Sequence, residues 1–140
     1  MADSLITPAM REAVGRTGEA RTATVERGAI ARFAEAIGDD NPAYPDVAPP
    51  TFLRSVGLAT PDMPDGDSLP RVLDGGSEWT FSTPVRPGDV ISFSTVLENL
   101  VERSGRLGAM VIATYATEYA NQDGVVVAVQ RNTLIRMAAA

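Results

Sequence analysis

The chain has 140 residues, with 18 acidic and 12 basic side chains and a formal net charge of −6. This length predicts one domain, which we place at 1–140 with residues 1–20 as a flexible, loosely held arm or a short helix. The basic residues are scattered arginines, so we expect no nucleic-acid partner. Cysteine and histidine are both absent, which removes the usual metal ligands, so we expect no metal either. No apolar run approaches the about 18 residues of a membrane span, and a cytoplasmic protein is the default expectation.

The first half of the chain predicts two helices after a short strand at residues 21–25. Ile30, Phe33, Ala34 and Ile37 have the spacing of one buried helix face. Gly38 follows at once and is typical of a helix C-terminal cap. A Pro-Pro pair favours the start of a second helix over residues 51–58. Residues 59–70 are rich in Pro, Asp and Gly and predict an acidic loop, whose interpretation as a lid is the weaker alternative.

The second half predicts four strands by its alternation of apolar and polar residues. They cover residues 77–83, 90–102, 107–120 and 125–137, and we expect them to form a meander. Trp79 and Phe81 share one face of the first strand, with Phe93 on the second. We interpret all three as core or dimer contacts, with lining of a ligand pocket as a secondary role. Early helices followed by long antiparallel strands indicate an α+β protein with helix packed on one sheet face.

Three motifs give the chain a resemblance to a known family. The segment of residues 33–42, which ends in Gly38-Asp39-Asp40-Asn41-Pro42, resembles the signature of MaoC-like (R)-hydroxyacyl dehydratases and enoyl hydratases. The likeness continues at residues 48–52 (Ala-Pro-Pro-Thr-Phe), closest to the N-terminal-type domain, and at residues 84–89 (Pro-Val-Arg-Pro-Gly-Asp). The resemblance implies a hot-dog fold, in which a curved antiparallel sheet wraps around a central helix and pairs with a second such domain.

The same resemblance implies a site and shows a departure from it. Catalytic members carry an Asp and, five positions later, a His; Asp39 matches the Asp, whereas Tyr44 stands at the histidine position. We therefore name Asp39 and Tyr44 as the catalytic remnant and expect them together at a pocket mouth near Asn41. The implied substrate-binding residues are Asn41, Thr51 and Arg86, where Thr51 is the first N–H donor after two prolines and Arg86 faces a phosphate of the carrier. The alternative interpretations are a turn acceptor for Asp39, a pocket-rim side chain for Tyr44 and a solvated arginine for Arg86.

Three functions remain open at this point. The leading hypothesis is a subunit of an acyl-thioester dehydratase or hydratase that shapes the acyl channel while a paralogous partner supplies the Asp–His dyad. The second is a homodimeric, non-catalytic module that binds acyl-CoA. The third is a self-sufficient hydratase or thioesterase that uses Asp39 with Tyr44. In each case the resemblance implies no cofactor, because the acyl thioester of coenzyme A or phosphopantetheine is the ligand.

Overall fold

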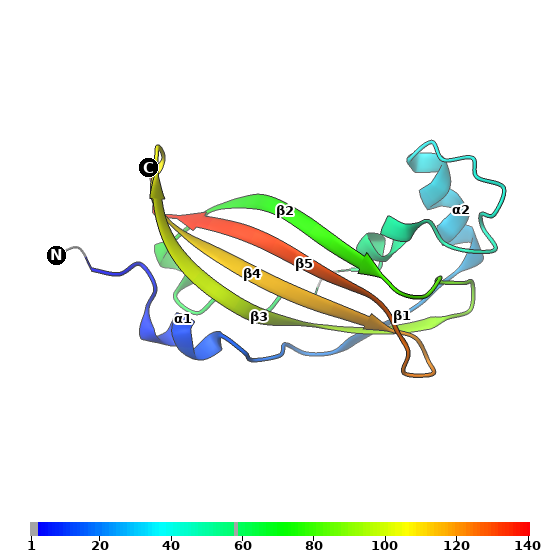
Figure 1. Cartoon of the computed structure of the whole chain (residues 1–140), viewed down its shortest axis with the longest axis horizontal. Helices are drawn as coiled ribbons and strands as arrows, with labels where there is room; N and C mark the ends of the chain where they lie inside the picture. The colour runs from blue at the N-terminus through cyan, green and yellow to red at the C-terminus, as the bar shows by residue number, and fades with distance from the viewer. Residues whose placement is uncertain (1–2, 58) are drawn as a thin grey trace.

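The architecture is one curved antiparallel sheet of five strands with its helices on the concave side and at one end (Figure 1). The computed structural model describes residues 3–57 and 59–140. The sheet order is β1-β3-β4-β5-β2, and every neighbouring pair is antiparallel. The strands are β1 (Arg21–Thr24), β2 (Arg71–Phe81), β3 (Val90–Gly105), β4 (Gly108–Ala120) and β5 (Val126–Met137). None of the described helices is long and apolar enough to cross a membrane.

The predicted meander is correct for β3, β4 and β5 and wrong for β2. β2 pairs with β5, at the opposite side of the sheet from β3. The connection between β2 and β3 explains this: its first residue, Ser82, still donates its N–H to the Val127 carbonyl at 2.9 Å. The chain therefore stays beside β5 before two prolines, Pro84 and Pro87, carry it across to β3. A connection of this length and stiffness does not form a tight hairpin.

β2 also begins six residues earlier than predicted. The sequence Asp74-Gly75-Gly76 has the composition of a turn, but it forms a β-bulge in the pairing with β5. The Asp74 carboxylate accepts the Gly76 N–H at 2.9 Å, and Gly76 has a φ of 117° that favours glycine. The bulge lets the strand continue, so β2 reaches from Arg71 to Phe81.

Helix α2 (Arg27–Ala36) ends at the predicted position, in a Schellman motif. Gly38 has a φ of 69° and donates its N–H to Glu35, while the N–H of Asp39 reaches the Ala34 carbonyl at 3.0 Å. Ile30 and Ala34 are buried as predicted, but Ile37 is 51% exposed, and its assignment to the core face was wrong. The reason is its position at the C-cap, where the backbone leaves the helix and the helical spacing no longer applies.

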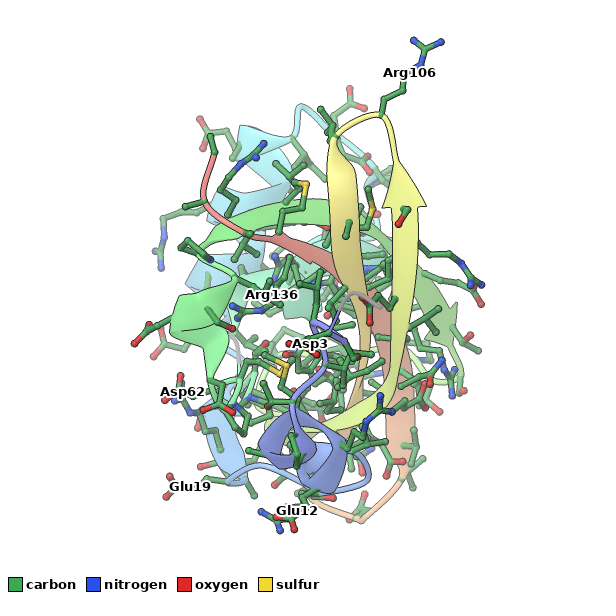
Figure 2. The ribbon with its side chains drawn as sticks, turned by 90° about the vertical axis from the view of Figure 1, so that its left-hand side faces the viewer. Asp3, Glu12, Glu19, Asp62, Arg106 and Arg136 are labelled. Carbon is green, nitrogen blue, oxygen red and sulfur yellow. The ribbon has the colours of Figure 1, made fainter. Side chains whose placement is uncertain are left out.

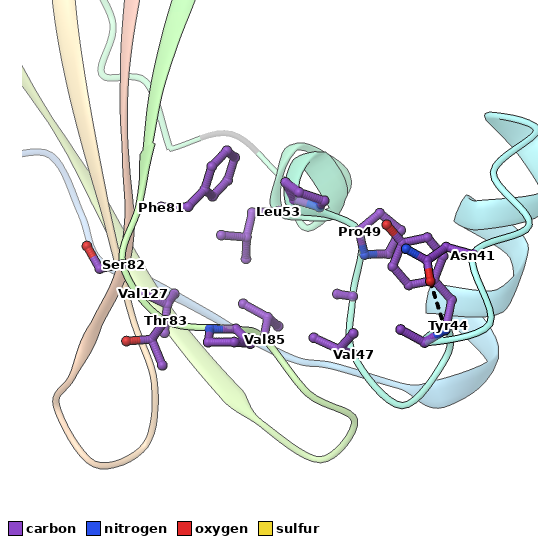
Figure 3. Close-up of a pocket in the computed structure, with 14 residues that line it drawn as sticks. Asn41, Tyr44, Val47, Pro49, Leu53, Phe81, Ser82, Thr83, Val85 and Val127 are labelled. Atoms are coloured by element: carbon purple, nitrogen blue, oxygen red, sulfur yellow. Dashed lines mark hydrogen bonds between the residues drawn. The ribbon is translucent and has the colours of Figure 1, made fainter.

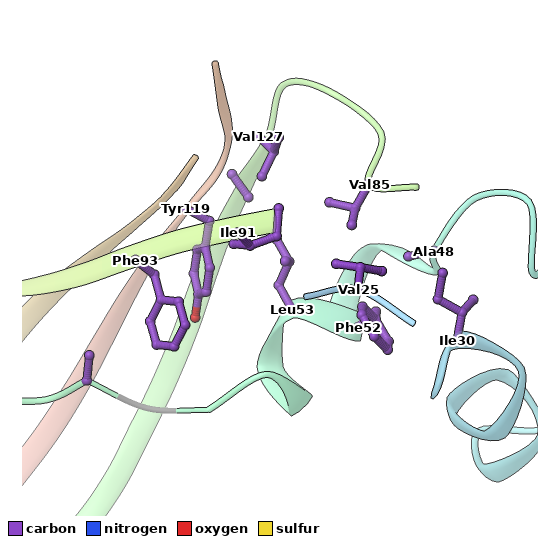
Figure 4. Close-up of a cluster of buried hydrophobic side chains, with 12 residues drawn as sticks. Val25, Ile30, Ala48, Phe52, Leu53, Val85, Ile91, Phe93, Tyr119 and Val127 are labelled. Atoms are coloured by element: carbon purple, nitrogen blue, oxygen red, sulfur yellow. The ribbon is translucent and has the colours of Figure 1, made fainter. Parts of the chain in front are cut away.

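The second predicted helix is shorter and tighter than expected. Residues Pro50–Ser55 form the 3₁₀ helix η1, and Leu58, the predicted end, lies outside the described residues. Phe52 and Leu53 are buried and belong to the same core cluster as Ile91 and Tyr119 of the sheet (Figure 4). This element therefore takes the place of the central helix around which the sheet curves. The loop of residues 59–70 contains only one further 3₁₀ turn, η2 (Gly66–Ser68).

The segment predicted to be a flexible arm is packed onto the sheet. It contains the helix α1 (Pro8–Ala13), which lies at the end of the molecule opposite α2 (Figure 1) and is turned toward the viewer in Figure 2. Met10 is 0% exposed and lies in a second core cluster with Leu97 and Tyr115. Glu102 of β3 accepts the Ser4 hydroxyl at 2.8 Å, which fixes the segment from its beginning. The short helix that the sequence left open for this segment is thus present at Pro8–Ala13.

Rows of side chains in register cross the concave face of the sheet. Phe93 of β3 lies opposite Tyr119 of β4, and the two rings stack with centroids 5.5 Å apart (Figure 4). The next row is polar: Thr95 and Thr117 are both buried, and their hydroxyls share a hydrogen bond of 2.7 Å. These rows confirm the predicted inward faces of β3 and β4.

Candidate functional site

A pocket of about 410 Å³ lies between the turn that follows α2, the helix η1 and the end of β2 (Figure 3). None of the described residues that line it carries a charge. The polar side chains are Asn41, Tyr44, Ser82 and Thr83. The remaining lining residues are apolar: Ala43, Val47, Ala48, Pro49, Pro50, Leu53, Phe81, Pro84, Val85 and Val127. An uncharged cavity with a few polar groups suits an apolar ligand that carries one polar function.

The turn after Gly38 brings Asp39, Asn41 and Tyr44 together at one end of this pocket. The N–H of Asn41 donates to one Asp39 carboxylate oxygen at 3.1 Å. The Asn41 side-chain oxygen accepts the N–H of Ala43 at 3.0 Å, and the Asn41 carbonyl accepts the N–H of Tyr44 at 3.0 Å. These bonds fold the turn back on itself, and Asn41 and Tyr44 line the pocket, whereas Asp39 is not among the lining residues.

The side chains of Asp39 and Tyr44 interact directly. Partial burial, the charge of Asp39 and the hydrogen bond to its carboxylate together raise the pKa of the Tyr44 phenol above its ordinary value. The phenol is therefore protonated at neutral pH, and it can donate a hydrogen bond but cannot accept a proton. The Asp39 carboxylate accepts the Asn41 N–H, which makes it a structural acceptor of the turn.

The structure does not bring the other two predicted binding residues into the pocket. Thr51 is exposed in the first turn of η1, and the lining there comes from Pro49, Pro50 and Leu53. Arg86 is also exposed, and its backbone N–H donates to the Asp89 carboxylate at 2.9 Å within the turn. Pro84 and Val85 reach the pocket from the same turn. A role for Thr51 or Arg86 would thus lie outside the pocket, toward the part of a ligand that extends into solvent.

Several lining residues were not predicted because they come from distant segments. Leu53, Val127 and the Ser82–Thr83 pair converge only through the crossing from β2 to β3. Phe81 was expected mainly in the core or at an interface, and it is 45% exposed at the pocket. Its only local signal was the alternation that it shares with Trp79. Across the described part of the chain, no group of three or more acidic side chains is arranged to hold a metal ion.

Comparisons with known proteins show the family and the fold of this chain. A family model described as FAS1-like, dehydratase domain region, matches residues 12–130. A UPF0336 protein of Streptomyces coelicolor is 34% identical over 98 residues, which are 58% of this chain and 65% of that protein's own length.

Solved structures share the fold at low sequence identity. The ChsH1-ChsH2 complex from Mycobacterium tuberculosis contains a chain with a TM-score of 0.78 and 23% identity, covering 94% of this chain and 92% of that one. The HadBC (3R-hydroxyacyl-ACP dehydratase) complex from the same organism contains a chain with a TM-score of 0.68 and 22% identity, covering 94% of this chain and 99% of that one. A MaoC-like dehydratase from Rhodospirillum rubrum has a TM-score of 0.67 and 21% identity, covering 91% of this chain and 94% of that one. Since the family model matches most of the chain, this protein belongs to the FAS1-like dehydratase domain family, and it has the hot-dog fold of the MaoC-like dehydratases.

Proposed function

We propose that this chain is the acyl-binding subunit of a heteromeric (R)-3-hydroxyacyl thioester dehydratase or enoyl hydratase, and that a hot-dog partner supplies the catalytic Asp and His. One observation carries the proposal. The position that the resemblance gives to the catalytic histidine holds Tyr44, which lines an uncharged pocket, in a chain without histidine. An uncharged pocket of a size to hold an acyl group supports the binding role, and the absence of histidine supports a partner that moves the proton.

The chemistry explains why the missing base matters. Hydration adds water across the double bond of an enoyl thioester: a base takes a proton from the water, its oxygen bonds to C3, and a proton is delivered to C2. Histidine suits this transfer because its pKa is about 6.5. Tyr44 has a raised pKa and holds its proton at neutral pH. It can donate a hydrogen bond to a thioester oxygen, which binds and polarises the substrate without taking the proton from water.

The sheet offers a place for the partner at its β2 edge. β2 has 11 residues and pairs with β5 on one side; no described strand pairs with its other side. Val72 and Leu73 on this strand are 44% and 47% exposed. A long exposed edge with apolar side chains is normally covered in a native protein. The proposed occupant is another hot-dog domain, since both complexes of Mycobacterium tuberculosis that share the fold consist of paired subunits by their names.

The proposal is tested by measuring hydration of a short enoyl-CoA with the purified chain, alone and after co-expression with a hot-dog chain that carries the Asp and His. We expect the chain alone to bind the thioester without hydrating it at an enzymatic rate. The complex should hydrate it at a rate higher by about 10²- to 10⁴-fold, the usual contribution of general acid–base catalysis. Asp39→Ala should then leave the rate of the complex nearly unchanged, whereas Val72→Asp with Leu73→Asp should weaken assembly.

Two outcomes would replace the proposal by its alternatives. If the isolated chain hydrates enoyl-CoA rapidly, and Asp39→Ala or Tyr44→Phe abolishes this, the chain is a self-sufficient enzyme with rewired chemistry. If it binds the thioester as a homodimer and no His-bearing chain associates with it, the non-catalytic binding module is correct.

A further inference from the structure

Phe81 presents an exposed aromatic face at the end of the pocket opposite Asn41 and Tyr44 (Figure 3). Its ring is stacked on Trp79 with centroids 5.5 Å apart and planes 6° from parallel. The stack covers one face of the Phe81 ring and leaves the ring 45% exposed. An exposed phenylalanine that is fixed in a pocket wall is a surface on which an apolar group of a ligand can lie.

The orientation of this ring is set by the register of the sheet. Phe81 lies opposite Ala128 of β5, and Ala128 lies opposite Tyr119 of β4. Because Ala128 is small and fully buried, the ring of Trp79 reaches over β5 and stacks on Tyr119 at 5.7 Å. Tyr119 in turn stacks on Phe93. Four rings therefore support one another across the sheet, and the free face of Phe81 is held in position before a ligand arrives.

The other walls of the pocket are stiff as well. Pro49, Pro50 and Pro84 contribute rings with no side-chain rotamers to adjust, and Leu53 is buried in the core. A flexible alkyl chain that enters such a pocket loses torsional freedom and gains no stacking. An aromatic ring loses less freedom, and a stacked aromatic pair contributes attraction beyond its buried area.

We propose that the pocket is selective for acyl groups that carry an aromatic ring, and that Phe81 is the residue that determines this specificity by stacking on the ring. The assignment of the ligand as a thioester rests on the proposed function. The ring would lie at the Phe81 end, and the thioester would lie toward Asn41 and Tyr44.

Isothermal titration with phenylacetyl-CoA, octanoyl-CoA and free coenzyme A tests this proposal. Both acyl groups have eight carbons, and octanoyl buries more apolar surface, so a pocket that responds only to hydrophobicity prefers octanoyl-CoA. We expect phenylacetyl-CoA to bind about two- to tenfold more tightly than octanoyl-CoA. Trp79, the single tryptophan, gives an independent fluorescence signal because it touches Phe81. Phe81→Leu should remove the preference, and Val125→Ala, a change at an apolar residue of similar exposure outside the pocket lining, should retain it.

The ring proposal is overturned if octanoyl-CoA binds as tightly as phenylacetyl-CoA, or if Phe81→Leu keeps the preference; thioester binding itself then still stands. Phenylacetamide separates the two proposals further. If this neutral ring ligand binds in a Phe81-dependent way while neither thioester binds, the ring site is supported and the thioester function fails. If phenylacetyl-CoA, octanoyl-CoA and phenylacetamide all fail to bind, the ring proposal fails together with the acyl-binding role.

Discussion

The buried pair of Thr95 and Thr117 allows a quantitative test of the sheet that supports the pocket. The two hydroxyls are 2.7 Å apart, and the residues are 1% and 8% exposed. Thr95→Val keeps the shape of the side chain and its β-branch, but it leaves the Thr117 hydroxyl without this partner. A buried unpaired polar group costs about 1–3 kcal/mol, and Thr117→Val should cost a similar amount for the same reason. The double variant replaces both hydroxyls by methyl groups and should be close to the native stability.

Urea unfolding followed by Trp79 fluorescence measures these free energies, since Trp79 is half-buried and stacks on Tyr119. The double-mutant cycle should give a coupling energy of about 2–6 kcal/mol in magnitude, the sum of the two single costs, because the double variant leaves neither hydroxyl unpaired. Thr80→Val, at an exposed position on β2, serves as the control and should change stability by less than about 0.5 kcal/mol. Strictly additive single effects, or a double variant less stable than either single one, would refute the assignment of this hydrogen bond.

Three further predictions follow from the backbone, the N-terminal segment and the tyrosines. Gly38→Ala should destabilise the protein by about 1–2 kcal/mol because φ is 69° there, whereas Gly28→Ala in the first turn of α2 should stabilise it by up to about 1 kcal/mol; denaturant unfolding compares the two. Met10→Ala should lower the free energy of unfolding by about 2–5 kcal/mol, since Met10 is fully buried. The control Leu107→Ala, at a residue that is 62% exposed, should lower it little. If both variants melt at the same temperature, the segment of residues 3–14 is not packed as described. Burial raises the pKa of Tyr115 and Tyr119, and burial together with the charge of Asp39 raises the pKa of Tyr44. All three phenols should therefore titrate above the unfolded value of about 10 in an absorbance titration, and their pKa values should fall when urea unfolds the protein. Their raised folded pKa values stabilise the protein fully below pH of about 10, and this stabilisation should disappear as pH rises through them.

The parts of the fold that the sequence predicted are those fixed by local chemistry. The inward faces of β3 and β4 follow from strict alternation, as Ile91 and Val111 show, and the α2 terminus follows from the left-handed preference of Gly38. The parts that failed depend on partners far along the chain. β2 pairs with β5 rather than with β3 because the connection after β2 crosses the sheet. The bulge at Gly76 was not predicted because its residues have the composition of a turn.

The candidate site divides in the same way. Asn41 and Tyr44 were predicted because one pinned turn places both, and the resemblance gave that turn a meaning. Phe81 and Val127 reach the pocket through strand order, which no local pattern in the sequence encodes. Thr51 was predicted as a binding residue because the two prolines before it have no N–H group. That reasoning identified the first turn of η1, but it did not predict which side of η1 faces the pocket.

Binding and chemistry are separable in this molecule because different segments supply them. The walls of the pocket come from η1, the end of β2 and residues 82–85, and the polar mouth comes from the turn after Gly38. Loss of an imidazole at position 44 changes the mouth and leaves the walls intact. Under the proposed function, a partner then needs to bring only a base to the mouth, since Tyr44 remains protonated and able to donate to a thioester oxygen. Under the same proposal, a chain without histidine sets which acyl group is accepted while its partner sets the rate.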